Sequence, residues 1–101
     1  MTESIRQFEW DPAKSAVNLE KHGMDFATAK ALWDDPKALT APAKITEAEP
    51  RYMTVAHLDG KLWSAIHTYR DGRIRIISVR RSRPGEAAAY AQAVFNRKPQ
   101  K

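Results

Sequence analysis

The sequence of 101 residues contains no cysteine. Disulfide bonds, zinc sites built on thiolates and catalysis by a thiol nucleophile are therefore excluded. Small secreted domains usually depend on disulfides, so their absence favours the cytoplasm. No apolar run approaches the ~20 residues that a membrane-spanning helix needs. The stretch Met1–Phe8 also lacks the apolar core of a signal peptide. We therefore expect a cytoplasmic protein that does not contact a membrane.

Two other kinds of site lack their usual residues. The four glycines stand far apart, at positions 23, 60, 72 and 85. They cannot form the glycine-rich loop that cradles a phosphate, and their spacing suits turns and helix ends. The three histidines are His22, His57 and His67. They have neither the i,i+4 spacing nor the neighbouring carboxylates of a metal site, so no metal or other cofactor is expected.

The net charge of +5 is concentrated in one short segment. Residues 1–69 hold 8 basic and 10 acidic residues, whereas residues 70–83 hold six arginines and one aspartate. Arginine keeps its charge, and its planar guanidinium can bind two phosphate oxygens at once. The segment from Arg70 to Arg83 therefore favours a phosphate-binding face that engages RNA. The alternative is a solvated strand edge whose charges keep the sheet soluble.

Turn and capping residues predict a single α+β domain over residues 1–101. Asp11 and Asp25 are good N-caps, Gly23 is a typical residue after a helix end, and Asp59-Gly60 suits a tight hairpin turn. The expected elements are a strand at 5–10, helices at 12–22 and 26–33, strands at 52–58, 61–69 and 73–80, and a helix at 86–95. Residues 37–50 look irregular, with at most a short strand near Leu39 or Ile45. The class is two N-terminal helices, an antiparallel meander and a C-terminal helix.

The arginines of the last strand cannot all share one face. Strict alternation places one set of side chains together: Ile74, Ile76, Ser78 and Arg80. It places another set on the opposite face: Arg73, Arg75, Ile77, Val79 and Arg81. Arg80 and Arg81 then point to opposite sides unless a bulge intervenes. One of the two can serve structure, for example by pairing with Glu86, while the other serves function.

Two pairs of residues outside that strand are further candidates. His67 and Tyr69 share a face of the preceding strand, where they could supply proton transfer and base stacking. The alternative for His67 is a hydrogen-bonded core residue. Lys21 and His22 end the first helix, where cations complement the helix dipole. Their functional alternative is projection toward the basic face of the sheet.

Several separated motifs occur in one order between Phe8 and Tyr90. The first runs Phe8-Glu9-Trp10-Asp11-Pro12-x-Lys14, followed by Asn18 and then Lys21-His22-Gly23-Met24-x-Phe26. Later matches are Asp35-Pro36, Arg51, Arg70, Arg75-Ile76-Ile77-Ser78-x-Arg80-Arg81, Glu86 and Tyr90. Together they resemble the BrnT toxin family of type II toxin–antitoxin modules.

The resemblance implies a RelE-like fold and a ribonuclease that degrades RNA and inhibits translation. The catalytic candidates that it favours are Arg70, Arg80, Arg81 and His22. Contacts to RNA are expected from Lys21, Arg51, Arg73, Arg75, His67 and Tyr69. It also implies a BrnA-type antitoxin that covers the active face and binds operator DNA, so that the toxin meets this DNA only through its partner. A toxin–antitoxin heterotetramer is one arrangement of such a pair.

RNA cleavage by such a protein needs no metal, because RNA carries its own nucleophile in the 2′-hydroxyl. The enzyme has to align this group with the phosphorus, stabilise the anionic phosphorane-like state and help a proton to leave. Arginines can perform the second task. Two alternatives use the same basic residues without catalysis: a module that only binds nucleic acid, and a domain that docks an acidic partner protein.

Overall fold

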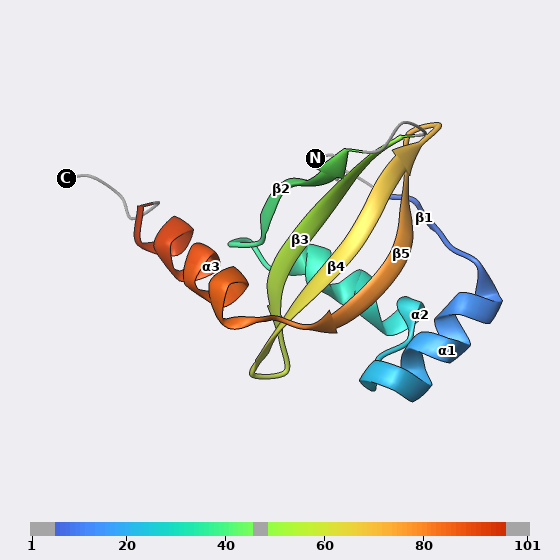
Figure 1. The fold of residues 1–101 in the computed structure, drawn as a ribbon, viewed down its shortest axis with the longest axis horizontal. Coiled ribbons are helices and arrows are strands. Elements are labelled where there is room, and N and C mark those ends of the chain that lie inside the picture. The colour runs from blue at the N-terminus through green and yellow to red at the C-terminus, as the bar shows by residue number, and fades with distance from the viewer. Residues whose placement is uncertain (1–5, 46–48, 97–101) are drawn as a thin grey trace, which may run out of the picture.

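The protein folds into a five-stranded sheet flanked by helices in a computed structural model, which describes residues 6–45 and 49–96 (Figure 1). The elements in chain order are β1 (Phe8–Glu9), α1 (Pro12–His22), α2 (Phe26–Ala29), the 3-10 helix η1 (Lys30–Asp34), β2 (Leu39–Ile45), β3 (Pro50–Leu58), β4 (Lys61–Arg70), β5 (Arg73–Arg81) and α3 (Pro84–Asn96). The strand order is β1-β5-β4-β3-β2. Every neighbouring pair is antiparallel except β1 with β5, so the predicted α+β class is confirmed. No helix in the described ranges is long and apolar enough to cross a membrane.

Capping residues define the first two helices as predicted. The Asp11 carboxylate accepts a hydrogen bond from the backbone N–H of Ala13 at 2.9 Å, and Gly23 ends α1 in the left-handed region with φ of 80°. Asp25 accepts one from Thr28 N–H at 2.8 Å. The second helix turns into the tighter 3-10 form at Lys30, which the sequence did not predict. Such tightening is common in the last turn of a helix.

The core lies between these helices and one face of the sheet. Its helical side consists of Met24, Phe26, Ala29, Leu32 and Trp33. Its sheet side comes from β3, β4 and β5, and includes Ala56, Trp63, Ala65, Ile74, Ile76 and Val79. Helix α3 contributes no fully buried residue and lies across the sheet from α1 and α2 (Figure 1).

The segment expected to be irregular forms an edge strand instead. Residues 39–45 pair with β3, and the register shifts between Pro42 and Lys44. Proline cannot donate a hydrogen bond to a sheet, but an edge strand with a bulge accommodates it. Pro42 is therefore compatible with strand β2. At the other edge β1 is shorter than the expected strand, and Ile5 lies outside the described residues.

A bulge in β5 overturns the predicted division of its side chains. The register shifts so that His67 pairs with Ile76 while Ile66 pairs with Ser78, which leaves Ile77 as the extra residue. The bulge puts Arg73 and Arg75 on the same side as Ser78 and Arg80, together with Arg70 of β4. We call these five residues the arginine face. Val79 and Arg81 lie on the opposite side with Ile74 and Ile76.

Candidate functional site

The arginine face has two ends that lie too far apart to share one phosphate group. Arg70 pairs with Arg73 beside the β4–β5 turn, whereas Arg80 pairs with Ser64 near the other end of both strands. At about 3.3 Å per residue, Arg73 and Arg80 stand roughly 20 Å apart along β5. The two leading catalytic candidates, Arg70 and Arg80, are therefore not brought together.

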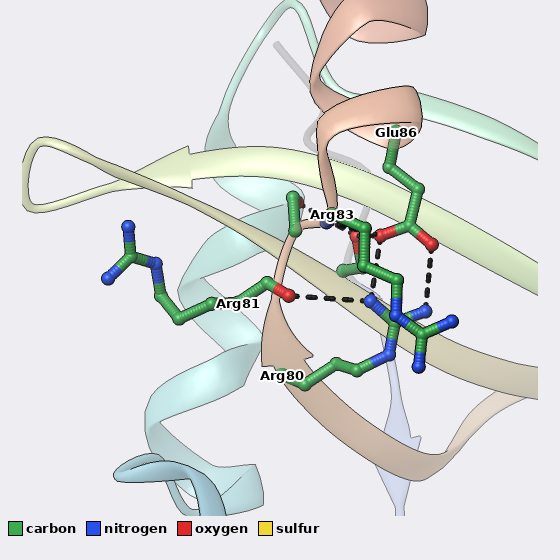
Figure 2. Close-up of polar contacts among 6 residues, drawn as sticks. Arg80, Arg81, Arg83 and Glu86 are labelled. Atoms are coloured by element: carbon green, nitrogen blue, oxygen red, sulfur yellow. Dashed lines mark hydrogen bonds and ion pairs between the residues drawn. The ribbon is translucent and has the colours of Figure 1, made fainter.

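Arg80 is held by a carboxylate at the start of α3 (Figure 2). Its two terminal nitrogens bind the two oxygens of Glu86 at 2.7 and 2.8 Å, and its side chain is only 17% exposed. Glu86 also accepts hydrogen bonds from Ser64 Oγ and from Arg83 N–H, so it caps the helix as well. Arg80 and these two donors lower the pKa of Glu86 to about 2. The predicted pairing of Arg80 with Glu86 is confirmed, and it gives Arg80 a structural contact.

Arg81 points away from this cluster, as alternation along the strand predicts (Figure 2). It pairs with Trp63 across the sheet, and its guanidinium carbon lies 5.6 Å from the centre of that indole ring. This distance suits a cation–π contact. Arg81 is exposed, so the ring orients its charge and leaves it accessible at the end of the sheet.

The other end of the arginine face carries exposed or weakly paired cations. Arg70 binds Glu49 at 3.0 Å with about half of its side chain exposed, and Arg75 binds Glu9 at 3.2 Å. Surface ion pairs of this kind contribute about 0–1 kcal/mol, so a phosphate can compete for either guanidinium. Arg73 is exposed. Arg51 of β3 has a buried Nε with no hydrogen-bond partner within residues 6–45 and 49–96.

Lys21 and His22 of α1 line a groove between this helix and β5. It encloses about 390 Å³, and its floor includes Ile77 and Ser78, the residues at the bulge. Lys14 lies along the same wall, seven residues before Lys21. Ser78 belongs to both the groove and the arginine face, so the two surfaces are continuous. We call this the α1 groove. Sequence reasoning did not select Lys14 as a site residue, although its helical spacing from Lys21 was a usable signal.

Asn18 holds the α1 groove together. Its side-chain amide donates to the carbonyls of Met24 at 2.7 Å and Val79 at 2.8 Å, and its oxygen accepts from Val79 N–H at 3.1 Å. The side chain thus binds the edge of β5 beyond the end of β1, as a neighbouring strand would. This fixes α1, with Lys21 and His22 on it, against β5. No group of three His, Asp or Glu side chains among residues 6–45 and 49–96 is arranged to hold a metal ion.

His67 lies in the core with none of its surface exposed, so it is not positioned to touch RNA. Its Nε2 is 2.8 Å from Thr54 Oγ1, and its ring packs edge-on against Trp33. Nδ1 is buried and has no hydrogen-bond partner among the residues that the structure describes. The structure places His67 as the hydrogen-bonded core residue of the alternative interpretation, because the face that it shares with Tyr69 is the one that the N-terminal helices cover. Tyr69 itself remains 51% exposed beyond those helices.

Burial of His67 should make the protein less stable as the pH falls. Burial lowers the pKa of His67 from 6.5 to about 4. Between pH 6.5 and 4, His67 is protonated in the unfolded chain but stays neutral in the folded chain. The free energy of unfolding therefore decreases as the pH falls through this range. The full loss amounts to about 3 kcal/mol. Urea unfolding measured between pH 7 and 4.5 should show most of this loss. The variant His67→Gln should flatten this dependence, and the exposed-histidine control His22→Gln should keep it. An equal slope in His67→Gln would contradict the assignment.

A family model described as the ribonuclease toxin BrnT of type II toxin–antitoxin systems matches residues 10–86. The match begins at Trp10, just before α1, and ends at Glu86, the partner of Arg80. It therefore covers the α1 groove and the whole arginine face. A comparison with curated proteins found no match.

Proposed function

The chain belongs to the BrnT family of ribonuclease toxins of type II toxin–antitoxin systems, and we propose that it cleaves RNA where the arginine face meets the α1 groove. Family membership supports the activity. The location of the cleavage site is inferred from the bulge at Ile77. The bulge puts Ser78 on the same face as Arg75, and Ser78 also lines the groove with Lys21 and His22. Cations that can bind phosphate and the His22 imidazole thus meet on one surface.

The proposed reaction uses the RNA 2′-hydroxyl and no metal ion. His22 removes the proton of this hydroxyl, and the oxygen attacks the adjacent phosphorus. The bond from phosphorus to the 5′-oxygen breaks, and that oxygen takes up a proton from solvent. The products are a 2′,3′-cyclic phosphate and a 5′-hydroxyl. Lys21 and Lys14 stabilise the charge that develops on the phosphoryl oxygens.

The arginines divide between binding the RNA backbone and supporting the fold. We assign Arg73 and Arg75 to phosphates beside the cleaved bond, and Arg70 to a phosphate farther along the strand. Arg51 of β3 adds positive charge near these arginines. Arg80 holds the start of α3 through Glu86 and thereby shapes the far end of the face. Arg81 and Tyr69 are exposed on the opposite side of the sheet, so they would contact RNA only where it passes around the ends of the strands.

A type II toxin implies both an RNA substrate and a cognate antitoxin. We propose a BrnA-type antitoxin that covers the arginine face and the α1 groove, so that RNA and antitoxin compete for them. Operator DNA is then bound through the antitoxin, with a heterotetramer as the repressing form. RNA cleavage in the cytoplasm inhibits translation.

Purified toxin without antitoxin should cleave RNA in buffer that contains EDTA. The cut ends should carry 2′,3′-cyclic phosphates, and RNA with 2′-O-methyl groups should stay intact because its nucleophile is blocked. Intact RNA bound in a salt-sensitive manner would favour the non-catalytic nucleic-acid module, since phosphate contacts weaken steeply with salt. An absence of RNA affinity at low salt would favour the partner-docking domain.

A further inference from the structure

A second groove lies on the other side of β1, between this strand and the helices α2 and η1. It encloses about 600 Å³, within the usual size range of small-molecule sites. The residues that matter in it are Phe8, Trp33, Arg6, Lys30 and Ala27. We call it the β1 groove. None of these residues belongs to the arginine face or the α1 groove.

The β1 groove combines aromatic walls with basic residues at its rim. Phe8 and Trp33 pack edge to face with ring centres 5.2 Å apart, and Phe8 is only half-buried. Arg6 and Lys30 are exposed, and the Lys30 ammonium lies 5.9 Å from the centre of the Trp10 ring. Aromatic side chains beside cations are the usual means by which proteins hold bases of single-stranded nucleic acid.

The position of β1 connects this groove to the arginine face. Phe8 pairs with Ile74 and Glu9 with Arg75, so successive residues of β1 face opposite sides of the sheet. Phe8 faces the β1 groove, while Glu9 reaches Arg75 on the arginine face. Within the described residues β1 is the outermost strand on this side (Figure 1). An RNA strand can therefore cross the β1 edge, with a phosphate at Arg75 and the next base in the groove.

We infer that the β1 groove binds one unpaired base of the RNA substrate and so sets which phosphate reaches the α1 groove. This inference rests on the proposed ribonuclease function. The base stacks against the Phe8 ring, and Lys30 and Arg6 lie near its phosphate. An acidic, aromatic segment of a partner protein would also meet this chemistry, but the continuity with Arg75 favours RNA.

Filling the groove tests the inference. Ala27 is exposed and lines the groove, so Ala27→Trp places a ring where the base would lie without altering the core. The probe is a short fluorescent 2′-O-methyl RNA, which binds without being cut, together with copies that lack one base at successive positions. Wild-type protein should bind one of these abasic copies about 5- to 100-fold more weakly than the intact probe. Ala27→Trp should bind the intact probe with a similar loss and no longer distinguish that copy.

Matched variants separate this effect from a general change in fold or charge. Ala88→Trp adds the same ring on an exposed position of α3 and should keep the wild-type pattern. Lys30→Ala should lose affinity, whereas Lys37→Ala, which removes an exposed lysine outside the groove, should not. Lys30→Ala also keeps the test valid if Ala27→Trp lowers the melting temperature.

Two outcomes would overturn the base site while leaving RNA cleavage intact. One is a wild-type protein that binds every abasic copy equally. The other is an Ala27→Trp variant that still discriminates as the wild type does, which would place the base elsewhere. Wild-type protein that neither binds nor cuts RNA would overturn both this site and the proposed function.

Discussion

Replacing His22 with Ala should slow RNA cleavage by about 10²- to 10⁴-fold, the usual contribution of a general acid or base. His22 is exposed in the last turn of α1 and lines the α1 groove beside Lys21 and Ser78. RNA affinity should change little, because the arginine face remains. The measurement is single-turnover cleavage with EDTA present, together with the dissociation constant of 2′-O-methyl RNA.

His57→Ala is the matched control for this loss. His57 is also exposed, but it lies on β3 with its ring stacked 6.2 Å from Tyr90, away from the α1 groove. Its removal should leave the cleavage rate unchanged. Equal losses in the two variants, or a wild-type rate in His22→Ala, would place the proton transfer at another group. A variant of Arg80 is a poor substitute for this test, since removing it leaves Glu86 partly buried without its charged partner.

Local sequence signals predicted the parts of the fold that depend on nearby residues. The caps of α1 and α2, the hairpin at Asp59-Gly60 and the pairing of Arg80 with Glu86 all join residues at most six positions apart. The bulge at Ile77 was beyond this kind of reasoning, because nothing in β5 alone sets its register against β4. One extra residue moved Arg75 to the face of Arg80 and so defined the arginine face.

The same limit explains why the burial of His67 and the place of Lys14 in the α1 groove were not predicted. Alternation along β4 predicted that His67 and Tyr69 share one face of the strand. It did not indicate which face of the sheet the helices cover. Lys14 and Ser78 line the same groove because α1 lies along the edge of β5. That arrangement depends on Asn18 reaching a strand 61 positions away. Separations of this size leave no periodic pattern in the sequence.

Asn18→Asp keeps the shape of the side chain but should strongly lower the stability of the fold. Asn18 is 6% exposed, and its amide nitrogen donates to two buried carbonyls, of Val79 and Met24. A carboxylate cannot donate, and its charge would face those two oxygens in a buried site. We expect a loss of about 3 kcal/mol or more in the free energy of unfolding, since each buried group left unsatisfied costs about 1–3 kcal/mol. The melting temperature should fall by roughly 12–24 °C, measured by circular dichroism at pH 7.

Asn96→Asp makes the same chemical change at an exposed residue near the end of α3 and should alter stability by no more than about 0.5 kcal/mol. Equal stability of the two variants would mean that α1 is held to β5 by other contacts. The change also bears on catalysis, because Asn18 positions the helix that carries Lys21 and His22 beside Ser78. At a temperature where Asn18→Asp is still folded, its cleavage rate should fall further than its RNA affinity. In the proposed mechanism the arginine face binds RNA without α1, whereas cleavage requires His22 to lie at the phosphate that this face presents.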